Sequence, residues 1–226
     1  MLMHPACFIV PGRIASADFC RRIELQLSPC SASALAILLP LLGCGEEAAA
    51  LAFDGLAVGT DNGEAAHILR TIAREERVHD SLMRGLMEIL PTPPDRSMMM
   101  RRAQRFHVQL GLGGRAVHLA RIAALDAAVC IILSRLVRPA LPLAADVQIC
   151  RTLTRIRNDE ARHVRWSRRL ALTEGPTRAQ RDAAAGSRDA LANVLALAAD
   201  AFELLSVDPA ILDRDVRALP NGLLTP

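Results

Sequence analysis

The sequence predicts an all-α protein built on a four-helix bundle with one crossover connection. Ala, Leu and Arg dominate the 226 residues, and no segment shows the alternation of apolar and polar residues that marks a strand. Gly and Pro gather in clusters that separate long segments of helical period. Two long helices, a longer connection and two further long helices are the arrangement of such a bundle.

The expected helices are bounded by Gly, Pro or turn residues. Pro40 is expected to start the main part of the first long helix or to kink it. The length suits a single domain over 1–226, with the bundle over about 31–174 and a C-terminal helical appendage over about 177–226. The predicted helices are a short N-terminal helix over 15–27, four bundle helices over 31–58, 63–90, 115–137 and 144–173, a connecting helix over 95–110, a C-terminal helix over 187–205, and a short helix after Pro209.

Two residue types are missing from the composition. The chain contains no Tyr, and since it also contains no Lys, all 27 basic residues are Arg. The missing Lys excludes a Schiff-base lysine, a pyridoxal-phosphate anchor and a Walker-type phosphate loop. The missing Tyr excludes a tyrosyl radical and a phenolic acid or base. Scattered Arg residues, a net charge of +3 and 3% aromatic residues argue against a nucleic-acid partner.

The six Cys residues are far apart and form no CxxC pair, so a zinc or rubredoxin-type site is not expected. The N-terminal residues lack the pattern of a signal peptide. The longest apolar run, Ala34 to Cys44, is too short to span a bilayer. We therefore expect a cytoplasmic protein with reduced thiols and no membrane partner.

Charged residues interrupt the apolar faces of the second and fourth bundle helices. Continuing the spacing of each face leads to a Glu-x-x-His pair, Glu76 with His79 and Glu160 with His163. A carboxylate and an imidazole on a buried face are costly unless they are paired, protonated or bound to metal. The alternative is two salt-bridged motifs on the surface. The positions that define the faces are Leu69, Ile72, Met83, Leu86 and Leu90 in one helix and Ile149, Leu153, Ile156, Ser167 and Leu170 in the other.

The other two bundle helices each place one carboxylate in the same way. Asp126 is the only charged residue between positions 122 and 134, and it lies on the apolar stripe. Glu46 lies on the inward stripe of the first helix, whereas Glu47 shares a face with Asp54; Glu47 is the alternative candidate. The other interpretation of Asp126 and Glu46 is a buried carboxylate without metal or a charge on the helix surface.

Four carboxylates and two imidazoles on four helices are the ligand set of a dinuclear metal centre in a bundle core. Carboxylates bridge the two cations, and one His completes each coordination sphere while a position stays open. Glu46 precedes Glu76 by 30 residues and Asp126 precedes Glu160 by 34, which suits antiparallel helices that meet at one level.

Glu75 and Asp159 directly precede the two ligand Glu residues. We expect each to accept the remaining ring N–H of a His across the bundle, which would orient that ring; the alternative is a solvated charge. We interpret the other residues nearby as structural, with Cys44 and Cys130 lining a cavity, Trp166 packing, and His107 and His118 ordinary.

These residues resemble the ferritin-like di-iron carboxylate superfamily, whose order is Glu, Glu-x-x-His, carboxylate, Glu-x-x-His. Gly45-Glu46 followed by Phe53 looks like the first-helix pattern of rubrerythrins. The segment Asp159-Glu160-Ala161-Arg162-His163 is similar to the Asp-Glu-x-x-His box of bacterial multicomponent monooxygenases and di-iron N-oxygenases. The resemblance covers about residues 31–170 and is specific for the superfamily but not for an activity.

Departures from the superfamily pattern reduce the number of protein classes that the chain can resemble. Asp126 stands where the family usually has Glu. The Cys spacing excludes the rubredoxin-like domain of a rubrerythrin, and the missing Tyr excludes the common radical-generating ribonucleotide reductase subunits. Ile122 stands four residues before Asp126, where an N-oxygenase with an additional ligand has His.

The resemblance implies a di-iron oxygenase or oxidase that uses O₂ to hydroxylate, desaturate or N-oxygenate a small organic molecule, for example in secondary metabolism. It implies two Fe ions, or a Mn/Fe pair, which suits the same ligands, and an electron donor such as ferredoxin or flavin reductase. The alternatives are a ferritin-like iron-binding or ferroxidase protein and a non-catalytic helical partner protein. Arg-rich faces and the C-terminal helix are compatible with a homodimer, which nothing in the sequence specifies.

Overall fold

The computed structural model describes residues 25–173 and 175–225. The described chain is helical and contains no strand, so the prediction of an all-α protein is confirmed. Most of the N-terminal helix predicted over 15–27 falls outside the described residues, and the part inside them, 25–27, is not helical. The helices are α1 (Pro29–Val58), α2 (Gly63–Ile89), α3 (Ser97–Leu110), α4 (Arg115–Leu136), α5 (Val147–Ala171), α6 (Arg178–Leu195), α7 (Ala199–Leu204) and α8 (Pro209–Arg217), with short 3₁₀ helices at Pro142–Ala145 and Ala196–Ala198.

Side-chain caps explain where three long helices begin. The hydroxyl oxygen of Ser28 accepts a hydrogen bond from the backbone N–H of Ser31 (3.1 Å) at the start of α1. Asn62 caps α2 in the same way (3.0 Å), and Asp146 caps α5 (3.0 Å). Pro40 lies inside α1 and does not start it, since the helix runs through that position.

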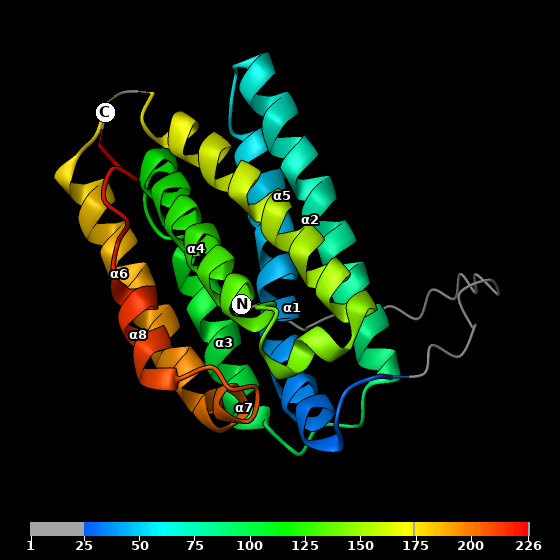
Figure 1. The fold of residues 1–226 in the computed structure, drawn as a ribbon. Helices are drawn as coiled ribbons and strands as arrows, with labels where there is room; N and C mark the ends of the chain where they lie inside the picture. The colour runs from blue at the N-terminus through cyan, green and yellow to red at the C-terminus, as the bar shows by residue number, and fades with distance from the viewer. Residues whose placement is uncertain (1–24, 174, 226) are drawn as a thin grey trace, which may run out of the picture.

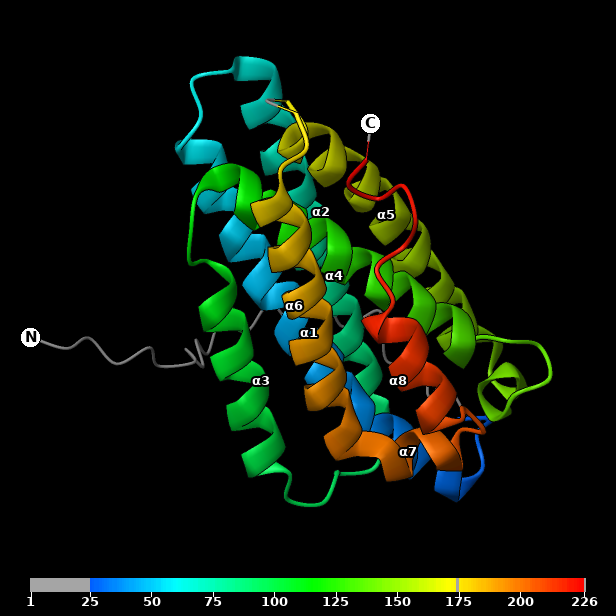
Figure 2. The ribbon, with the colours of Figure 1, turned by 90° about the vertical axis from the view of Figure 1, so that its left-hand side faces the viewer.

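Two pairs of helices form the centre of the molecule. α1 packs along α2, and α4 packs along α5 (Figure 1). Because only residues 59–62 join α1 to α2, these two helices are antiparallel. α2 contacts α5, α6 packs on α4, and α3 contacts both α1 and α6 (Figure 2). Among the described elements, α1 and α4 do not pack closely against each other.

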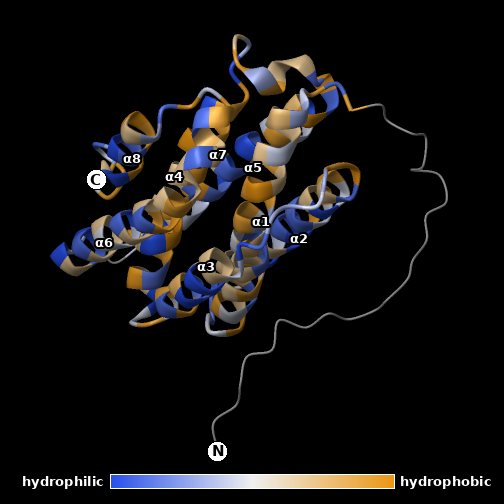
Figure 3. Cartoon of the chain, turned by 90° about the horizontal axis from the view of Figure 1, so that it is seen from below, coloured by the Kyte–Doolittle hydropathy of each residue, from blue (hydrophilic) through white to orange (hydrophobic). Residues whose placement is uncertain are grey.

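The apolar core consists of two clusters at different heights along these helices. One cluster contains Leu35 and Leu39 of α1 together with Met83, Ile132 and Ile156 and their neighbours. The other contains Phe53, Leu69, Ile72, Leu119 and Ile122 and their neighbours. Hydrophilic and hydrophobic positions interleave around α2 and α6, as expected of amphipathic helices that cover a core (Figure 3). The sequence positions between the two clusters on α1, α2, α4 and α5 are those of the predicted metal ligands.

The C-terminal helix predicted over 187–205 is wrong at both ends. α6 begins at Arg178, where Thr177 and Gln180 form a capping box, and it continues through Gly186. A reciprocal cap satisfies two N–H groups of the first turn, which favours this earlier start over one after the glycine. α6 ends at Leu195, and a 3₁₀ turn separates it from α7. The short helix after Pro209 is present as α8.

Arg188 of α6 is a fully buried cation that fixes the C-terminal helices onto α4. Its Nε donates to the carbonyl of Val216 (2.5 Å), and its two terminal nitrogens donate to the carbonyls of Ala124 (2.8 Å) and Asp215 (2.9 Å). Asp215 and Val216 lie in the last turn of α8, where helix carbonyls without an intrahelical partner favour a positive charge. Burial lowers the pKa of Arg188 to about 10. The contact holds α6 in place beside the candidate site described below.

α1 and α4 are long and apolar enough to cross a membrane by length and composition alone. The apolar run considered from sequence, Ala34 to Cys44, was shorter than these helices because Glu46 and Glu47 follow it. The buried core helices of a soluble protein meet the same criterion, and in both helices more than half of the apolar window is buried. These two helices are therefore only weak support for a membrane location.

Candidate metal centre

Six buried side chains from four helices converge between the two apolar clusters. Glu46 of α1, Glu76 and His79 of α2 and Glu160 of α5 form one group in which ligand atoms lie within 4.8 Å of one another. Asp126 of α4 forms a second such group with Glu160 and His163 of α5. The six are the predicted ligands, and each group could hold a metal ion, with Glu160 shared between the two groups.

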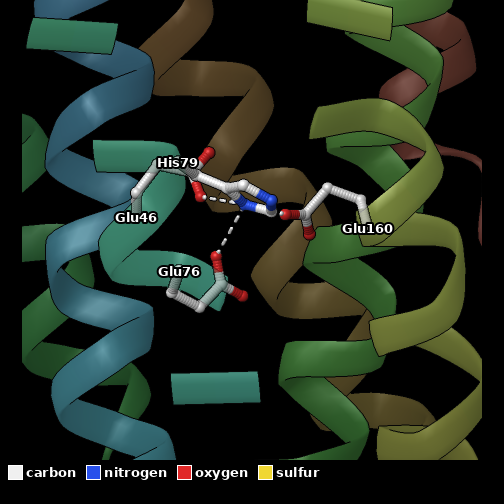
Figure 4. Close-up of side chains that lie close together, drawn as sticks. All are labelled: Glu46, Glu76, His79 and Glu160. Atoms are coloured by element: carbon white, nitrogen blue, oxygen red, sulfur yellow. Dashed lines mark hydrogen bonds and ion pairs between the residues drawn. The ribbon is translucent and has the colours of Figure 1, made fainter. Parts of the chain in front are cut away.

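The first group is arranged around one nitrogen of His79. Its Nδ1 lies 3.2 Å from Glu46 Oε2, 3.3 Å from Glu76 Oε2 and 3.1 Å from Glu160 Oε1. Figure 4 shows the three carboxylates reaching this ring from three helices. Hard carboxylate oxygens with one imidazole nitrogen suit Fe, Mn or Zn.

His163, which belongs to the second group, is likewise approached by two carboxylates. Its Nδ1 lies 3.0 Å from Glu76 Oε1 and 3.6 Å from Glu160 Oε1. The two imidazole rings have centroids 5.7 Å apart. Glu76 and Glu160 therefore each face both histidines, which is the placement required of carboxylates that bridge two metals. Phe53 packs edge-on against His163, with ring centroids 6.4 Å apart.

The other nitrogen of each histidine faces outward to a carboxylate of the opposite helix. His79 Nε2 lies 3.2 Å from Asp159 Oδ2, and His163 Nε2 lies 2.8 Å from Glu75 Oε2. These are the contacts across the bundle that the sequence predicted. Because the Nε2 proton is donated outward, Nδ1 is the nitrogen that faces the cluster and would bind a metal once its own proton is released.

Arg162 joins the two outward carboxylates and was not predicted. Its Nη1 donates to Asp159 Oδ1 (2.6 Å), and its Nη2 donates to Glu75 Oε1 (3.0 Å). The only signal in the sequence is its position three residues after Asp159, which favours an ion pair on one helix. The bridge to Glu75 on α2 depends on how the two helices pack.

The ionisable groups of the cluster shift one another's pKa values because they are buried close together. Burial lowers the pKa of His163, but the nearby carboxylates of Glu160 and Glu76 outweigh this and raise it to about 11. The pKa of His79 is also raised, because the nearby carboxylates of Glu160, Glu46 and Glu76 outweigh burial. Burial and nearby carboxylates raise the pKa of Glu46 and of Asp126 well above the usual range.

Glu76 shifts in the opposite direction from these two carboxyls. Burial raises its pKa, but the nearby imidazoles of His163 and His79 outweigh burial and lower the pKa to about 2. Glu76 is therefore a carboxylate throughout the neutral range, with a charge available to a cation.

The cluster also leaves buried polar atoms without hydrogen bonds. Within the described residues these include Glu76 Oε1, Asp126 Oδ2, Glu160 Oε1 and His163 Nδ1. The 3.1 Å approach of Glu160 Oε1 to His79 does not have hydrogen-bond geometry, so proximity alone does not satisfy this oxygen. An unsatisfied buried polar atom costs about 1–3 kcal/mol. Divalent cations would satisfy all four atoms, so the donor set fits a dinuclear metal centre.

The structure places the remaining candidates around this cluster. Glu46 is only 5% exposed, whereas Glu47 is exposed, so Glu46 is the inward residue of the pair. Cys130 Sγ lies 3.6 Å from the carbonyl of Arg157, and burial together with Glu160 and Asp126 raises the pKa of its thiol to about 12. Cys44 is half-buried. Trp166 packs against the second apolar cluster under the guanidinium of Arg169 (5.3 Å), which agrees with a packing role.

A cavity of about 240 Å³ adjoins the cluster between α1 and α4. The four predicted ligand carboxylates line it, whereas His79 and His163 do not. α1 contributes small residues to its wall, among them Gly45, Ala49 and Ala52, whereas α4 contributes larger ones. Small side chains on α1 leave room that the side chains of α3, α4 and α6 do not fill. The cavity therefore reaches the cluster from the side opposite the histidines.

His107 and His118, interpreted as ordinary from sequence, both lie in the wall of this cavity. Nothing in the spacing of either residue marked it, because the cavity forms only when α3 and α4 pack around α1.

The comparisons with known proteins do not assign the chain to a family. No protein-family model matches it, and neither the curated proteins nor the solved structures searched include a match.

Proposed function

We propose that this protein is a di-iron carboxylate oxygenase or oxidase that uses O₂ to oxidise a small organic molecule. In this proposal α1, α2, α4 and α5 form a ferritin-like four-helix bundle, with α3 in the crossover. The observation that carries it is the pair of buried ligand groups that share Glu160 and face an apolar cavity through their carboxylates. A metal centre that served only structure would not need the cavity.

Each predicted ligand has a definite task in this proposal. Glu46, Glu76 and His79 would hold one ion, and Asp126, Glu160 and His163 the other, with Glu76 and Glu160 placed to contact both. The two ions would supply O₂ activation with electrons from a donor protein such as ferredoxin or flavin reductase. A Mn/Fe pair suits the same donors.

The rest of the chain orients the ligands and excludes water. Asp159 and Glu75 hold the two imidazole rings from outside, and Arg162 fixes both carboxylates. The apolar cavity wall keeps the substrate side dry, which strengthens electrostatic interactions there. Because the sequence has no Tyr, the oxidant is not relayed to a phenol.

We further propose that the protein works in the cytoplasm, without membrane or nucleic-acid partners. The support is compositional, since the Arg residues are scattered and the net charge is small. Among the described residues, Cys30, Cys44, Cys130 and Cys150 are free thiols.

The proposal is tested by anaerobic loading with Fe(II) followed by O₂ uptake measurements. An oxygenase binds two iron ions per chain and takes up O₂ in proportion to supplied reductant, faster when its organic substrate is present. A ferroxidase takes up O₂ in proportion to added Fe(II) and continues as more is added. A partner protein without catalysis binds no iron, and that result would refute the proposal.

A further inference from the structure

The cavity beside the cluster contains a polar group without a polar partner. His107 of α3 lines the cavity and is half-buried, and its imidazole ring makes no hydrogen bond or ion pair within the described residues. Its ring packs against Phe106 at a centroid distance of 4.9 Å. A buried polar group without a partner is costly, so such a group in a cavity wall indicates where a ligand would bind.

Gly45 of α1 brings His107 close to the metal-ligand level. A Cβ atom at Gly45 would lie 3.6 Å from Cε1 and 3.8 Å from Nε2 of the His107 ring. These are ordinary van der Waals distances, so the ring lies directly against the α1 backbone at Gly45. Gly45 directly precedes Glu46, so the tip of the imidazole lies beside the helical turn that carries a predicted ligand.

The charges around the cavity favour an uncharged ligand. The only ionisable groups in its lining are the four predicted ligand carboxylates and two histidines, with no Arg. Two divalent cations would balance the four carboxylates, which leaves no counter-charge for a charged guest. Burial lowers the pKa of His107 to about 4, so its ring is neutral at pH 7. Burial together with Arg121 also lowers the pKa of His118.

The volume and shape of the cavity limit the size of the ligand. An apolar cavity of about 150 Å³ holds benzene, so the 240 Å³ here suits a molecule of about ten non-hydrogen atoms. His118 and Asp126 of α4 both line the cavity and are two helical turns apart, about 12 Å. The space is thus elongated along α4, as a fused ring system would require.

We propose, on the basis of the function proposed above, that the cavity binds an uncharged, mainly apolar bicyclic molecule whose single polar group hydrogen-bonds to His107. The hydrogen bond fixes one end of the molecule, so that its apolar part lies along Ile122 and Val129 toward the carboxylates. His107 is a positioning residue in this proposal, because it sets which atom of the substrate faces the metal ligands.

Isothermal titration calorimetry with indole, whose N–H can donate to the neutral imidazole, tests the proposal. Indene, with the same ring skeleton and no polar group, is measured by displacement of indole, and indole-3-carboxylate is the charged counterpart. The titrations use metal-free protein and Zn(II)-loaded protein, so that no turnover is needed. We expect indole to bind more tightly than indene and the carboxylate not to bind.

Two variants give the decisive results. His107→Leu should weaken indole binding about fivefold, the loss of one neutral hydrogen bond, while indene binding stays unchanged and His107→Gln retains part of the indole affinity. His67→Leu, at an exposed histidine of α2, is the matched control and should change neither. Ala49→Phe should abolish binding by filling the cavity, whereas Leu51→Phe at an exposed position of α1 should not.

Absence of indole binding to the wild type would overturn this proposal, and so would equal weakening of indole and indene by His107→Leu. These outcomes are separate from failure of the metal centre. If Zn(II) does not bind but indole binds the metal-free protein with the expected His107 dependence, the cavity proposal stands and the di-iron proposal fails. Two bound metal ions without indole binding would give the reverse conclusion.

Discussion

The two sides of the carboxylate–histidine cluster are built differently. On the side of α2 and α5, each histidine is held from outside by a carboxylate, and Arg162 joins the two carboxylates. On the side of α1 and α4, Glu46 and Asp126 face a cavity, and Asp126 Oδ2 makes no hydrogen bond within the described residues. The side with the histidines is held by hydrogen bonds, and the side with Glu46 and Asp126 borders the cavity.

This difference suggests a division of tasks between the helix pairs. α2 and α5 supply the Glu-x-x-His motifs and the residues that orient them, so we infer that they determine metal affinity. α1 and α4 add one carboxylate each and shape the cavity, so we infer that they determine which molecule reaches the centre. Substitutions on the two sides should therefore have different consequences.

The largest effect is expected for Glu160→Ala, because Glu160 belongs to both ligand groups. Loss of this side chain should weaken the binding of both ions more than about 100-fold, beyond the usual effect of residues that only support ligands. Metal analysis of protein produced with ample iron should show a fall from two ions per chain to nearly none. The exposed neighbour variant Glu47→Ala controls for loss of a helix carboxylate, and an unchanged metal load in Glu160→Ala would refute the site.

A smaller effect is expected for Glu46→Ala, because Glu46 belongs to one group only. The protein should lose the ion held with His79 and keep the one held by Asp126 and His163, so that about one ion per chain remains. Metal titration followed by inductively coupled plasma mass spectrometry measures this. Loss of both ions would show that the two ligand groups do not bind their ions independently.

Asp159→Asn should weaken metal binding about 10–100-fold without removing a ligand. The reason is that the carboxylate that contacts His79 Nε2 from outside the cluster is replaced by an amide. Competition titration with a chelator measures the change in affinity. Asp54→Asn is the matched control, since Asp54 pairs with Arg77 at the surface away from the cluster. Equal affinities of Asp159→Asn and wild type would show that the outer carboxylates do not orient the histidines.

The smallest effect concerns protons. The pKa values of His163 and His79 are both raised, that of His163 to about 11. Each ring therefore carries a second proton at pH 7, which a metal must displace. The raised pKa values of Glu46 and Asp126 add up to two more protons. Loading two ions should release about two to four protons, measured with an indicator dye in weak buffer.

The sign of the pH dependence follows from this proton release. Protons compete with the metal, so apparent affinity falls as pH falls below the raised pKa of His163, about 11, and continues to fall through neutrality. Metal-independent stability should change in the opposite direction, because groups with raised folded pKa values favour the folded state at low pH and lose that contribution as pH rises through those values. Metal affinity that did not vary with pH would contradict the protonation pattern.

The parts of the site that lie on one helix were predictable from sequence. Glu76 with His79 and Glu160 with His163 interrupt apolar faces of helical period, and each such interruption is visible within a single helix. The inward direction of Glu46 rather than Glu47 follows from the same periodicity and agrees with their burial.

Apart from the contacts of Glu75 and Asp159 with the histidines, the parts that depend on packing between helices were not predictable. Arg162 reaches Glu75 on another helix, and no spacing within α5 shows this contact. The cavity exists because small residues of α1 face α4 while α3 and α6 close the space, so His107 has no distinguishing mark in its own helix. The early start of α6 depends on the Thr177–Gln180 capping box, from which the helix continues through Gly186.

The most direct test of the central claim is a Mössbauer spectrum of protein loaded anaerobically with ⁵⁷Fe(II) and then exposed to O₂. We expect two iron ions per chain that become ferric and magnetically coupled, with the coupled signal absent in Glu160→Ala. A single uncoupled iron, or wild-type protein that binds no iron, would contradict a dinuclear centre formed by Glu46, Glu76, His79, Asp126, Glu160 and His163.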